Sequence, residues 1–308
     1  MKNIQFTGIR SAIFTPLNAD GSVNTKMIKP LVDFGLDRGL KGFYVVGSTG
    51  EGPALSAEAR MEATAAVVEA CKSRKTVYGD TPDVIVHVAA PDTYDAFKLA
   101  KHAKECGADA ISSLAPNFYA THNAQEMLDY YKRLTAISDL PLLIYATGLL
   151  TGSVGGSLKA FIEEAMKIEH IIGLKYTIRD YHQLNVLKTI NDGDINIING
   201  PDETLLGGLA MGADGGIGST YNLVPQWFVK IWDLYHEGKM EEARVYQTKV
   251  NKLIGALASF NGGYLTAAKN AMKFLGLDIG TCAYPAMTYS ADELKKLEAT
   301  VKAAGLEF

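Results

Sequence analysis

Short apolar runs alternate with longer amphipathic segments along most of the chain. Apolar runs of this length between helical patterns are typical of buried parallel strands. The eight expected strands are Ile9–Phe14, Gly42–Val46, Val84–Ala89, Ala110–Leu114, Leu142–Tyr145, Ile171–Lys175, Ile195–Asn199 and Gly215–Gly218. Eight strand-then-helix units in succession predict an α/β fold whose parallel sheet closes into a (β/α)8 TIM barrel, rather than an open doubly wound sheet.

Capping residues mark the starts of several helices between these strands. Ser56 and Asp92 carry short polar side chains that can accept a hydrogen bond from the first free N–H groups of a helix. Asn123, followed by Glu126 three residues later, forms a capping-box pattern. The helices expected after these caps are Ala57–Ser73, Thr93–Cys106 and Met127–Ile137.

From Tyr221 onward the strand-like runs cease and the pattern becomes helical. Ser290 with Glu293 forms a further capping box, and Gly305 is a typical helix stop. The helices expected in this part are Pro225–Glu237, Met240–Ser259, Leu265–Gly276 and Asp292–Ala304. We expect the first of them to complete the barrel. The predicted division is therefore a catalytic barrel domain over residues 1–235 and a C-terminal helical extension over residues 236–308.

The composition is that of an ordinary globular enzyme. The 308 residues are 47% hydrophobic and 21% charged, and the formal net charge is −4. This mild acidity gives no electrostatic footprint for nucleic acid or for an anionic membrane. The amino terminus lacks the apolar stretch of a signal peptide, and no later run approaches the length of a membrane span. We therefore expect a cytoplasmic protein without nucleic-acid or membrane partners.

Cysteines and histidines are poorly spaced for metal binding. Cys71, Cys106 and Cys282 lie far apart and form no C-x-x-C pair, which predicts neither a disulfide framework nor a zinc site. The six histidines never show the spacing H-x-x-x-H. His87 lies in a strand pattern, and we expect it to be a core residue with satisfied hydrogen bonds. No G-x-G-x-x-G follows the first strand, which disfavours a nicotinamide-dependent enzyme.

A lysine ends the sixth expected strand, in the run Ile171-Ile172-Gly173-Leu174-Lys175-Tyr176-Thr177. Burial disfavours the charged ammonium form and lowers the pKa of a lysine, so that its amine can attack a carbonyl carbon and form a Schiff base. The simpler alternative is a strand that ends one residue earlier and a Lys175 side chain that reaches solvent. The residues at the other strand ends decide between these two interpretations.

Polar residues follow several of the other strands, and the carboxyl ends of barrel strands are where barrel enzymes carry their chemistry. The second strand runs into Gly47-Ser48-Thr49-Gly50-Glu51-Gly52, whose hydroxyls and N–H groups suit a carboxylate or phosphate oxygen. The fifth strand ends in Tyr145, a possible proton carrier. Asp202 and Glu203 follow the seventh strand and could hold sugar hydroxyls. Each signal alone is also compatible with a plain turn, core packing or a solvated loop.

Four stretches together resemble one known family. They are the residues GSTGE at 47–51, Tyr145, GLKYT at 173–177 and GADGGIGSTYN at 212–222. In this order they are similar to the N-acetylneuraminate lyase and dihydrodipicolinate synthase family of pyruvate-dependent, Schiff-base class I aldolases. The resemblance covers essentially the whole chain. It implies a (β/α)8 barrel with a C-terminal helical extension, assembled as a homotetramer.

The resemblance also implies a role for each candidate residue. Lys175 matches the lysine that forms the imine with pyruvate, and Tyr145 matches the tyrosine that moves protons to and from the sugar. Ser48 and Thr49 match the pair that holds the pyruvate carboxylate. The positions that match residues facing the sugar chain in the lyases are Thr177, Gly200, Asp202, Glu203 and Ser219.

The implied activity is the reversible cleavage of N-acetylneuraminate to N-acetylmannosamine and pyruvate. Its partners are these small molecules, and the chemistry requires no metal or diffusible cofactor. Two alternatives stay open. One is an aldolase or dehydratase that acts on another 2-keto-3-deoxy sugar acid. The other is a barrel that binds a keto acid without turning it over, which an intact Lys175 and Tyr145 disfavour.

The sequence departs from the family pattern at several positions. Residues 146–150 lack the usual Asn and Pro, and Leu150 stands where the synthases place an arginine, which argues against a synthase. Arg179 occupies a position where a small residue is usual, so the substrate shape could differ. Phe118, with Tyr119 next to it, stands where many relatives have a tyrosine that joins a proton relay across a subunit interface.

Overall fold

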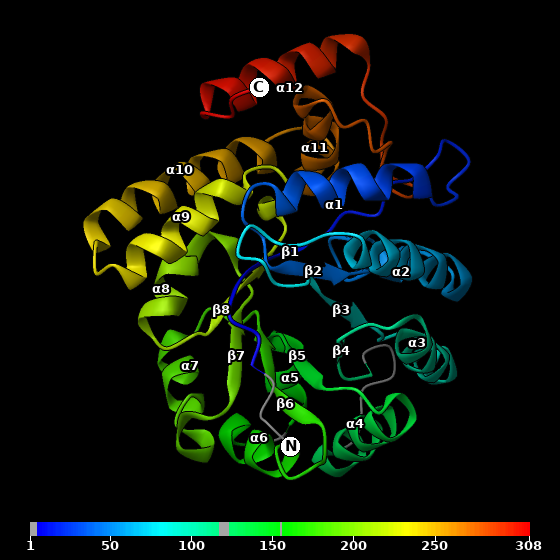
Figure 1. The fold of residues 1–308 in the computed structure, drawn as a ribbon, viewed down its shortest axis with the longest axis vertical. Coiled ribbons are helices and arrows are strands. Elements are labelled where there is room, and N and C mark those ends of the chain that lie inside the picture. The colour runs from blue at the N-terminus through cyan, green and yellow to red at the C-terminus, as the bar shows by residue number, and fades with distance from the viewer. Residues whose placement is uncertain (1–4, 117–122, 155) are drawn as a thin grey trace.

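The computed structural model describes residues 5–116, 123–154 and 156–308, and within them eight parallel strands close into a barrel (Figure 1). Each strand pairs with the next one in the chain, and β1 pairs with β8. The strands are β1 (Gly8–Ala12), β2 (Gly42–Val45), β3 (Asp83–His87), β4 (Ala110–Ser113), β5 (Leu142–Ala146), β6 (Ile171–Tyr176), β7 (Asn196–Asn199) and β8 (Gly215–Gly218). The expected barrel is confirmed, and every expected strand overlaps an observed one.

Helices follow the strands and surround the barrel in the described part of the chain (Figure 1). They are α1 (Ile28–Leu36), α2 (Ala57–Lys72), α3 (Thr93–Cys106), α4 (Ala124–Ser138), α5 (Gly148–Ser153), α6 (Leu158–Ala165), α7 (Tyr181–Leu187), α8 (Leu205–Ala210), α9 (Pro225–His236), α10 (Met240–Ala258), α11 (Gly263–Ala271) and α12 (Ala291–Ala303). Two short 3-10 turns used below are η4 (Asp202–Thr204) and η6 (Met272–Leu275).

The expected helix caps are present. The side chains of Ser56, Asp92 and Asn123 each accept a hydrogen bond from a backbone N–H in the first turn of α2, α3 and α4. Ser290 and Glu293 form a complete capping box at the start of α12. Such bonds satisfy N–H groups that have no partner inside the helix, which is why these local signals fix the helix starts so well.

One expected helix has a different shape. The segment predicted as a single helix from Leu265 to Gly276 begins at Gly263 as α11 and continues from Met272 as the tighter turn η6. Gly276 then ends it with a positive φ of 80°, a conformation that glycine adopts without steric cost. The sequence predicted the helix end at Gly276 correctly, but it did not predict the change from an α-helix to a 3-10 turn.

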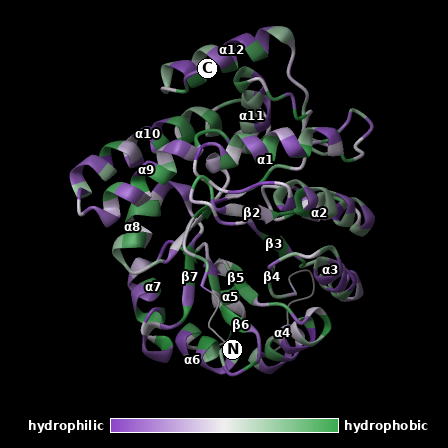
Figure 2. Cartoon of the chain, in the orientation of Figure 1, coloured by the Kyte–Doolittle hydropathy of each residue, from purple (hydrophilic) through white to green (hydrophobic). Residues whose placement is uncertain are grey.

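The core has two layers, because alternate strand residues point to opposite sides of the sheet. One layer fills the inside of the barrel, and the other lies between the sheet and the surrounding helices. In Figure 2, β5 and β6 are mostly hydrophobic, and the outer helices carry hydrophilic stretches. The inner layer includes a cluster of buried hydrophobic residues: Phe6, Ala12, Tyr44, Ile85, Ala110, Leu143, Ile198 and Ile217.

The C-terminal helices lie to one side of the barrel, at the top of Figure 1. Helix α9 packs against β1 and α8, whereas α10 packs against α9 and also against the η4 turn at the barrel mouth. The division of the chain at residue 235 falls at the end of α9 and stays a prediction. Among the helices in the described ranges, none combines the length and apolarity needed to cross a membrane.

Candidate active site

Lys175 and Tyr145 lie side by side at the carboxyl ends of neighbouring strands. They are register partners in the β5–β6 pair, where the register shifts between Leu142 and Leu143. The Lys175 Nζ lies 3.7 Å from the centroid of the Tyr145 ring and 4.9 Å from that of Tyr44. Lys175 is only 5% exposed and Tyr145 only 7% exposed. The amine predicted from the sequence is therefore inside the barrel mouth and not on the surface.

The Tyr145 phenol has a lowered pKa. The positive charge of Lys175 lowers the pKa of Tyr145, against burial, which raises it. Hydrogen-bonding neighbours of the phenol, Ser48 among them, also lower its pKa. A phenol with a lowered pKa gives up its proton more readily than a free phenol, which suits Tyr145 to carry a proton in either direction.

A buried polar layer lies below this pair. The Tyr44 hydroxyl donates to Ser112 Oγ over 3.1 Å and lies 3.0 Å from His87 Nδ1. The Tyr44 and His87 rings both meet the Tyr145 ring edge-on. Burial lowers the pKa of His87 well below its usual value, which keeps the ring neutral. The expectation that His87 is a satisfied core residue is confirmed.

The loop after β2 reaches the loop after β8. Thr49 Oγ1 and Ser219 Oγ are 2.5 Å apart, and one of them donates to the other. The structure thus joins a residue expected at the keto-acid carboxylate to one expected at the sugar chain. Two loops far apart in the sequence form one wall of the site because β1 lies between β2 and β8 in the closed barrel.

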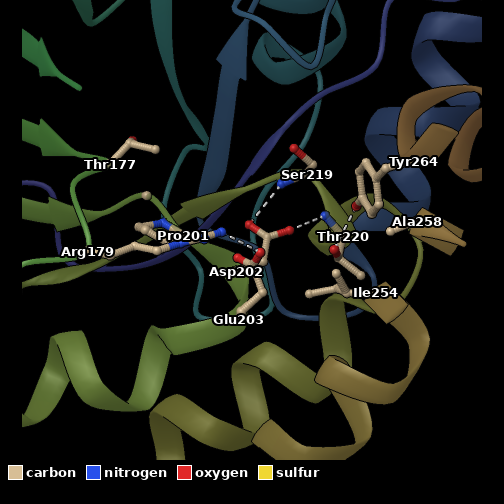
Figure 3. Close-up of a pocket in the computed structure, with 11 residues that line it drawn as sticks. Thr177, Arg179, Pro201, Asp202, Glu203, Ser219, Thr220, Ile254, Ala258 and Tyr264 are labelled. Carbon is tan, nitrogen blue, oxygen red and sulfur yellow. Dashed lines mark hydrogen bonds and ion pairs between the residues drawn. The ribbon is translucent and has the colours of Figure 1, made fainter. Parts of the chain in front are cut away.

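A pocket of about 440 Å³ opens beside this wall, a size typical of small-molecule sites (Figure 3). All five residues expected to face a sugar chain line it, and helices α10 and α11 supply part of the opposite side. Gly200 approaches Thr177 so closely that a Cβ there would lie 2.0 Å from the Thr177 Oγ1. The lining residues are Thr177, Arg179, Gly200, Pro201, Asp202, Glu203, Ser219, Thr220, Ile254, Ala258 and Tyr264.

Asp202 holds the loop after β8 from below the pocket. One carboxylate oxygen accepts the Ser219 N–H over 3.1 Å, and the other accepts the Thr220 N–H over 2.6 Å (Figure 3). The carboxylate packs so tightly that a Cβ on Gly218 would overlap it at 1.8 Å. Burial raises the pKa of Asp202 to about 6 despite these donors. Asp202 thus positions the Ser219 hydroxyl in addition to lining the pocket.

Glu203 is paired with Arg179 across the pocket. Glu203 Oε1 accepts from the Arg179 guanidinium over 2.9 Å (Figure 3). The Arg179 side chain is 72% exposed and the Glu203 side chain is 37% exposed, so solvent screens the pair and it adds little stability. The bulky residue at position 179 therefore orients the Glu203 carboxylate within the pocket.

Several site residues escaped the sequence analysis. Tyr264 on α11 bonds the Thr220 Oγ1 over 2.7 Å, and Ile254 and Ala258 on α10 line the same pocket. No local motif marks these positions, because they reach the site only through the packing of the extension against the barrel. Tyr44 could have been found, since it occupies an inward-facing position near the carboxyl end of β2.

A smaller pocket adjoins Tyr145 and is lined by Leu149 and Leu150, among other residues. Leu150 is buried, so an apolar side chain occupies the position where the synthases place an arginine. Phe118 and Tyr119, the residues of the doubtful proton relay, lie outside the described residues. Over the described ranges, no group of three or more His, Cys, Asp or Glu side chains is placed to hold a metal ion.

Comparisons with known proteins agree with this geometry. A family profile described as the dihydrodipicolinate synthetase family matches residues 5–304. The chain is 34% identical to an N-acetylneuraminate lyase of Rhizobium meliloti, over 97% of this chain and 95% of the relative. Solved N-acetylneuraminate lyases from Proteus mirabilis and Aliivibrio salmonicida superpose with a TM-score of 0.89 each, at 27% and 28% identity, and cover 99% of this chain and 100% and 99% of theirs.

The barrel, its mouth and these comparisons define the class of protein: the chain is an enzyme, a class I aldolase. It belongs to the dihydrodipicolinate synthetase family. The family resemblance expected from the four sequence stretches is thereby confirmed.

The buried carboxyl group of Asp202 predicts how stability depends on pH. Its folded-state pKa of about 6 lies above the value of about 3.9 in an unfolded chain. Between about pH 4 and 6 the folded state therefore binds more protons here, and the free energy of unfolding falls as the pH rises. On average across this window, the wild-type value minus that of Asp202→Asn should fall by about 1 kcal/mol per pH unit.

Urea denaturation at half-unit pH intervals measures this difference. Glu203→Gln is the matched control, because Glu203 is the neighbouring carboxylate but is partly exposed. A difference between wild type and Asp202→Asn that stays flat from pH 4 to 6 would contradict the raised pKa.

Proposed function

We propose that this aldolase cleaves N-acetylneuraminate to N-acetylmannosamine and pyruvate, reversibly, through a Schiff base on Lys175. The observation that carries the proposal is the buried Lys175 amine beside Tyr145, next to a pocket of about 440 Å³ that Thr177, a hydrogen-bonding neighbour of Tyr145, lines. The names of the relatives point to the same substrate. A barrel that only binds a keto acid has no need of an amine placed for imine formation.

The first step makes the imine. The Lys175 nitrogen attacks the C2 carbonyl carbon of the open-chain substrate, and loss of water leaves a protonated imine. When the C3–C4 bond breaks, its electron pair moves into a C2–C3 double bond and neutralises the imine nitrogen. The product at Lys175 is an enamine instead of an unstabilised carbanion. Protonation of C3 and hydrolysis of the imine then release pyruvate and the free amine.

Tyr145 moves the proton that this cleavage requires. It accepts the proton of the C4 hydroxyl as C4 becomes the aldehyde carbon of N-acetylmannosamine. The protonated imine keeps the positive charge of Lys175 beside the phenol until the bond breaks. The charge that lowers the pKa of Tyr145 in the free enzyme therefore persists during the proton transfer.

The two ends of the substrate meet different walls of the site. Ser48 and Thr49 hold the carboxylate of the keto acid, and the Thr49–Ser219 contact joins this end to the pocket for the sugar chain. Thr177, Gly200 and Glu203 face the chain. We assign Asp202 mainly to holding the Ser219 loop, because both of its oxygens already accept backbone N–H groups.

The setting of this activity is proposed from the family resemblance. We propose a homotetramer, located in the cytoplasm, whose partners are the small-molecule substrate and products. The catalytic barrel spans residues 1–235, and the helical extension over residues 236–308 completes the pocket. The extension supplies Ile254, Ala258 and Tyr264, so it participates in the site although it carries none of the reacting groups.

The nucleophile can be tested by trapping. Borohydride added with pyruvate should reduce the imine, fix a covalent adduct on Lys175 and inactivate the enzyme. Lys175→Ala should abolish both the adduct and pyruvate release from N-acetylneuraminate. Peptide mass spectrometry locates the adduct. An adduct on another lysine, or full activity of the alanine variant, would overturn the assignment.

The proton carrier can be tested with Tyr145→Phe, which keeps the ring and removes the hydroxyl. Turnover should fall by about two to four orders of magnitude, the usual range for lost general acid–base catalysis. Tyr235→Phe is the matched control, because its hydroxyl donates to Leu209 O on the outside of the barrel. A loss of less than about threefold in the Tyr145 variant would rule out the chemical role.

Recognition of the sugar chain can be tested with Glu203→Gln, which keeps the shape and removes the charge. Bonds from hydroxyls to a carboxylate are stronger than bonds to an amide, so kcat/KM for N-acetylneuraminate should fall about tenfold. Borohydride trapping of pyruvate should stay unchanged. Glu237→Gln, an exposed carboxylate paired with Lys239, is the control.

The same assay separates the remaining candidate substrates. A six-carbon 2-keto-3-deoxy acid offers a shorter polyhydroxylated chain to Glu203 than N-acetylneuraminate does. If the wild type prefers 2-keto-3-deoxygluconate, or if Glu203→Gln leaves activity on the long substrate unchanged, the sialic acid proposal fails and only the pyruvate aldolase chemistry stands.

A further inference from the structure

A second lysine is buried at the barrel mouth, on the C-terminal extension. Lys269 of α11 is 0% exposed. Its Nζ donates to Thr15 O over 2.9 Å, to Glu51 Oε1 over 2.6 Å and to Thr281 O over 2.8 Å. An ammonium group has three N–H donors, and all three are used. Lys269 is therefore a fixed cation and not a second nucleophile.

Its carboxylate partner belongs to the loop that carries Ser48 and Thr49. Glu51 is buried as well, and its other oxygen accepts the Ala283 N–H over 2.6 Å. Its backbone is held at a φ of 58°, in the left-handed region that residues other than glycine rarely adopt. Such a conformation persists only where the surroundings impose it. The contacts of the Glu51 side chain supply that constraint.

The ion pair connects three separate parts of the chain around this loop. Lys269 binds the segment after β1 through Thr15 O, and the Thr15 hydroxyl in turn donates to Gly50 O over 2.6 Å. Glu51 binds the C-terminal segment through Ala283. The loop from Ser48 to Glu51 is thus fixed from both sides by groups that never line the pocket for the sugar chain.

We propose that the buried Lys269–Glu51 pair is a positioning device that holds Ser48 and Thr49 in place to bind the carboxylate of the keto acid. The inference rests on the proposed function and deepens it, because it makes the C-terminal extension part of the carboxylate site. Neither Lys269 nor Glu51 touches the substrate. Both act through the loop from Ser48 to Glu51, which follows β2.

Stability alone is a weak reason for such a pair. Removing two charges from water opposes their mutual attraction, and buried pairs can often be replaced by uncharged groups without loss of stability. A pair placed next to a binding loop has a second consequence, since it admits only one arrangement of that loop. Pyruvate binding, rather than unfolding, is therefore the property that the pair should control.

Pyruvate trapping by borohydride provides the test, with methyl pyruvate as a probe that lacks the carboxylate. The variants are Lys269→Met, Glu51→Gln and the double variant, which leaves no unpaired buried charge. Lys188→Met is the matched control. Lys188 donates to the Asp214 carboxylate and to Ile195 O in a similar arrangement, but next to the amino ends of β7 and β8.

We expect the pyruvate concentration for half-maximal trapping to rise about tenfold in Lys269→Met and in the double variant. The corresponding concentration of methyl pyruvate should change less than about threefold. The double variant should recover the wild-type melting temperature but not its pyruvate affinity. In Lys188→Met, the concentrations of pyruvate and of methyl pyruvate for half-maximal trapping should stay within about twofold of the wild-type values. If Lys269→Met does not fold, the double variant and Glu51→Gln carry the test.

Three results would overturn the inference. The first is an equal loss of affinity for pyruvate and for methyl pyruvate, and the second is a double variant that recovers its pyruvate affinity together with its stability. The third is an unchanged pyruvate affinity in all Lys269 and Glu51 variants. Absence of trapping in the wild type is a different failure. It would overturn the proposed function itself, and this inference with it.

Discussion

The register between β5 and β6 is the constraint on which the site depends. It pairs Tyr145 with Lys175, and the inward direction of both side chains follows from the alternation along each strand. The irregularity between Leu142 and Leu143 sets this register three residues before Tyr145. A slip of either strand by one residue would turn the side chain of that strand, Tyr145 or Lys175, toward the outer helices and separate the amine from the phenol. The chemistry therefore depends on backbone pairing before it depends on any loop.

Buried charge is stabilised in two different ways around this pair. Lys175 lies against aromatic rings, and its charge acts on the Tyr145 phenol. Asp202 and the Lys269–Glu51 pair instead bind backbone groups, which satisfies each charge and fixes a loop at the same time. In the first arrangement Lys175 becomes a nucleophile once it loses a proton, and a hydrogen bond joins it to the Tyr145 phenol. The second commits all three Lys269 donors, and at least one acceptor site on each carboxylate oxygen, to neighbouring groups, so these side chains position the loops around them.

The sequence predicted the features that local physics determines. Strand runs, the caps at Ser56, Asp92 and Asn123, and the stop after η6 all depend on residues close together in the chain. The strand-end rule for barrels then brought the candidate residues to one end of the fold. Contacts between distant segments leave no such local signal in the sequence. Nothing near Tyr264 or Lys269 in the sequence indicates Thr220 or Glu51 as a partner, because only the packing of α11 against the barrel brings them together.

Because of that packing, the barrel and the extension both contribute residues to the site. The barrel alone supplies the groups that we propose to react, since Lys175 and Tyr145 come from β6 and β5. The extension supplies Ile254, Ala258 and Tyr264 to the pocket through α10 and α11, and the buried Lys269 next to Glu51. Under the proposed function, substitutions in the extension would therefore alter which sugar chain is accepted, or how the keto acid is held, without removing the groups proposed to react. Under the proposed function, the barrel and the extension thus share the recognition of the substrate, whereas the reacting groups come from the barrel.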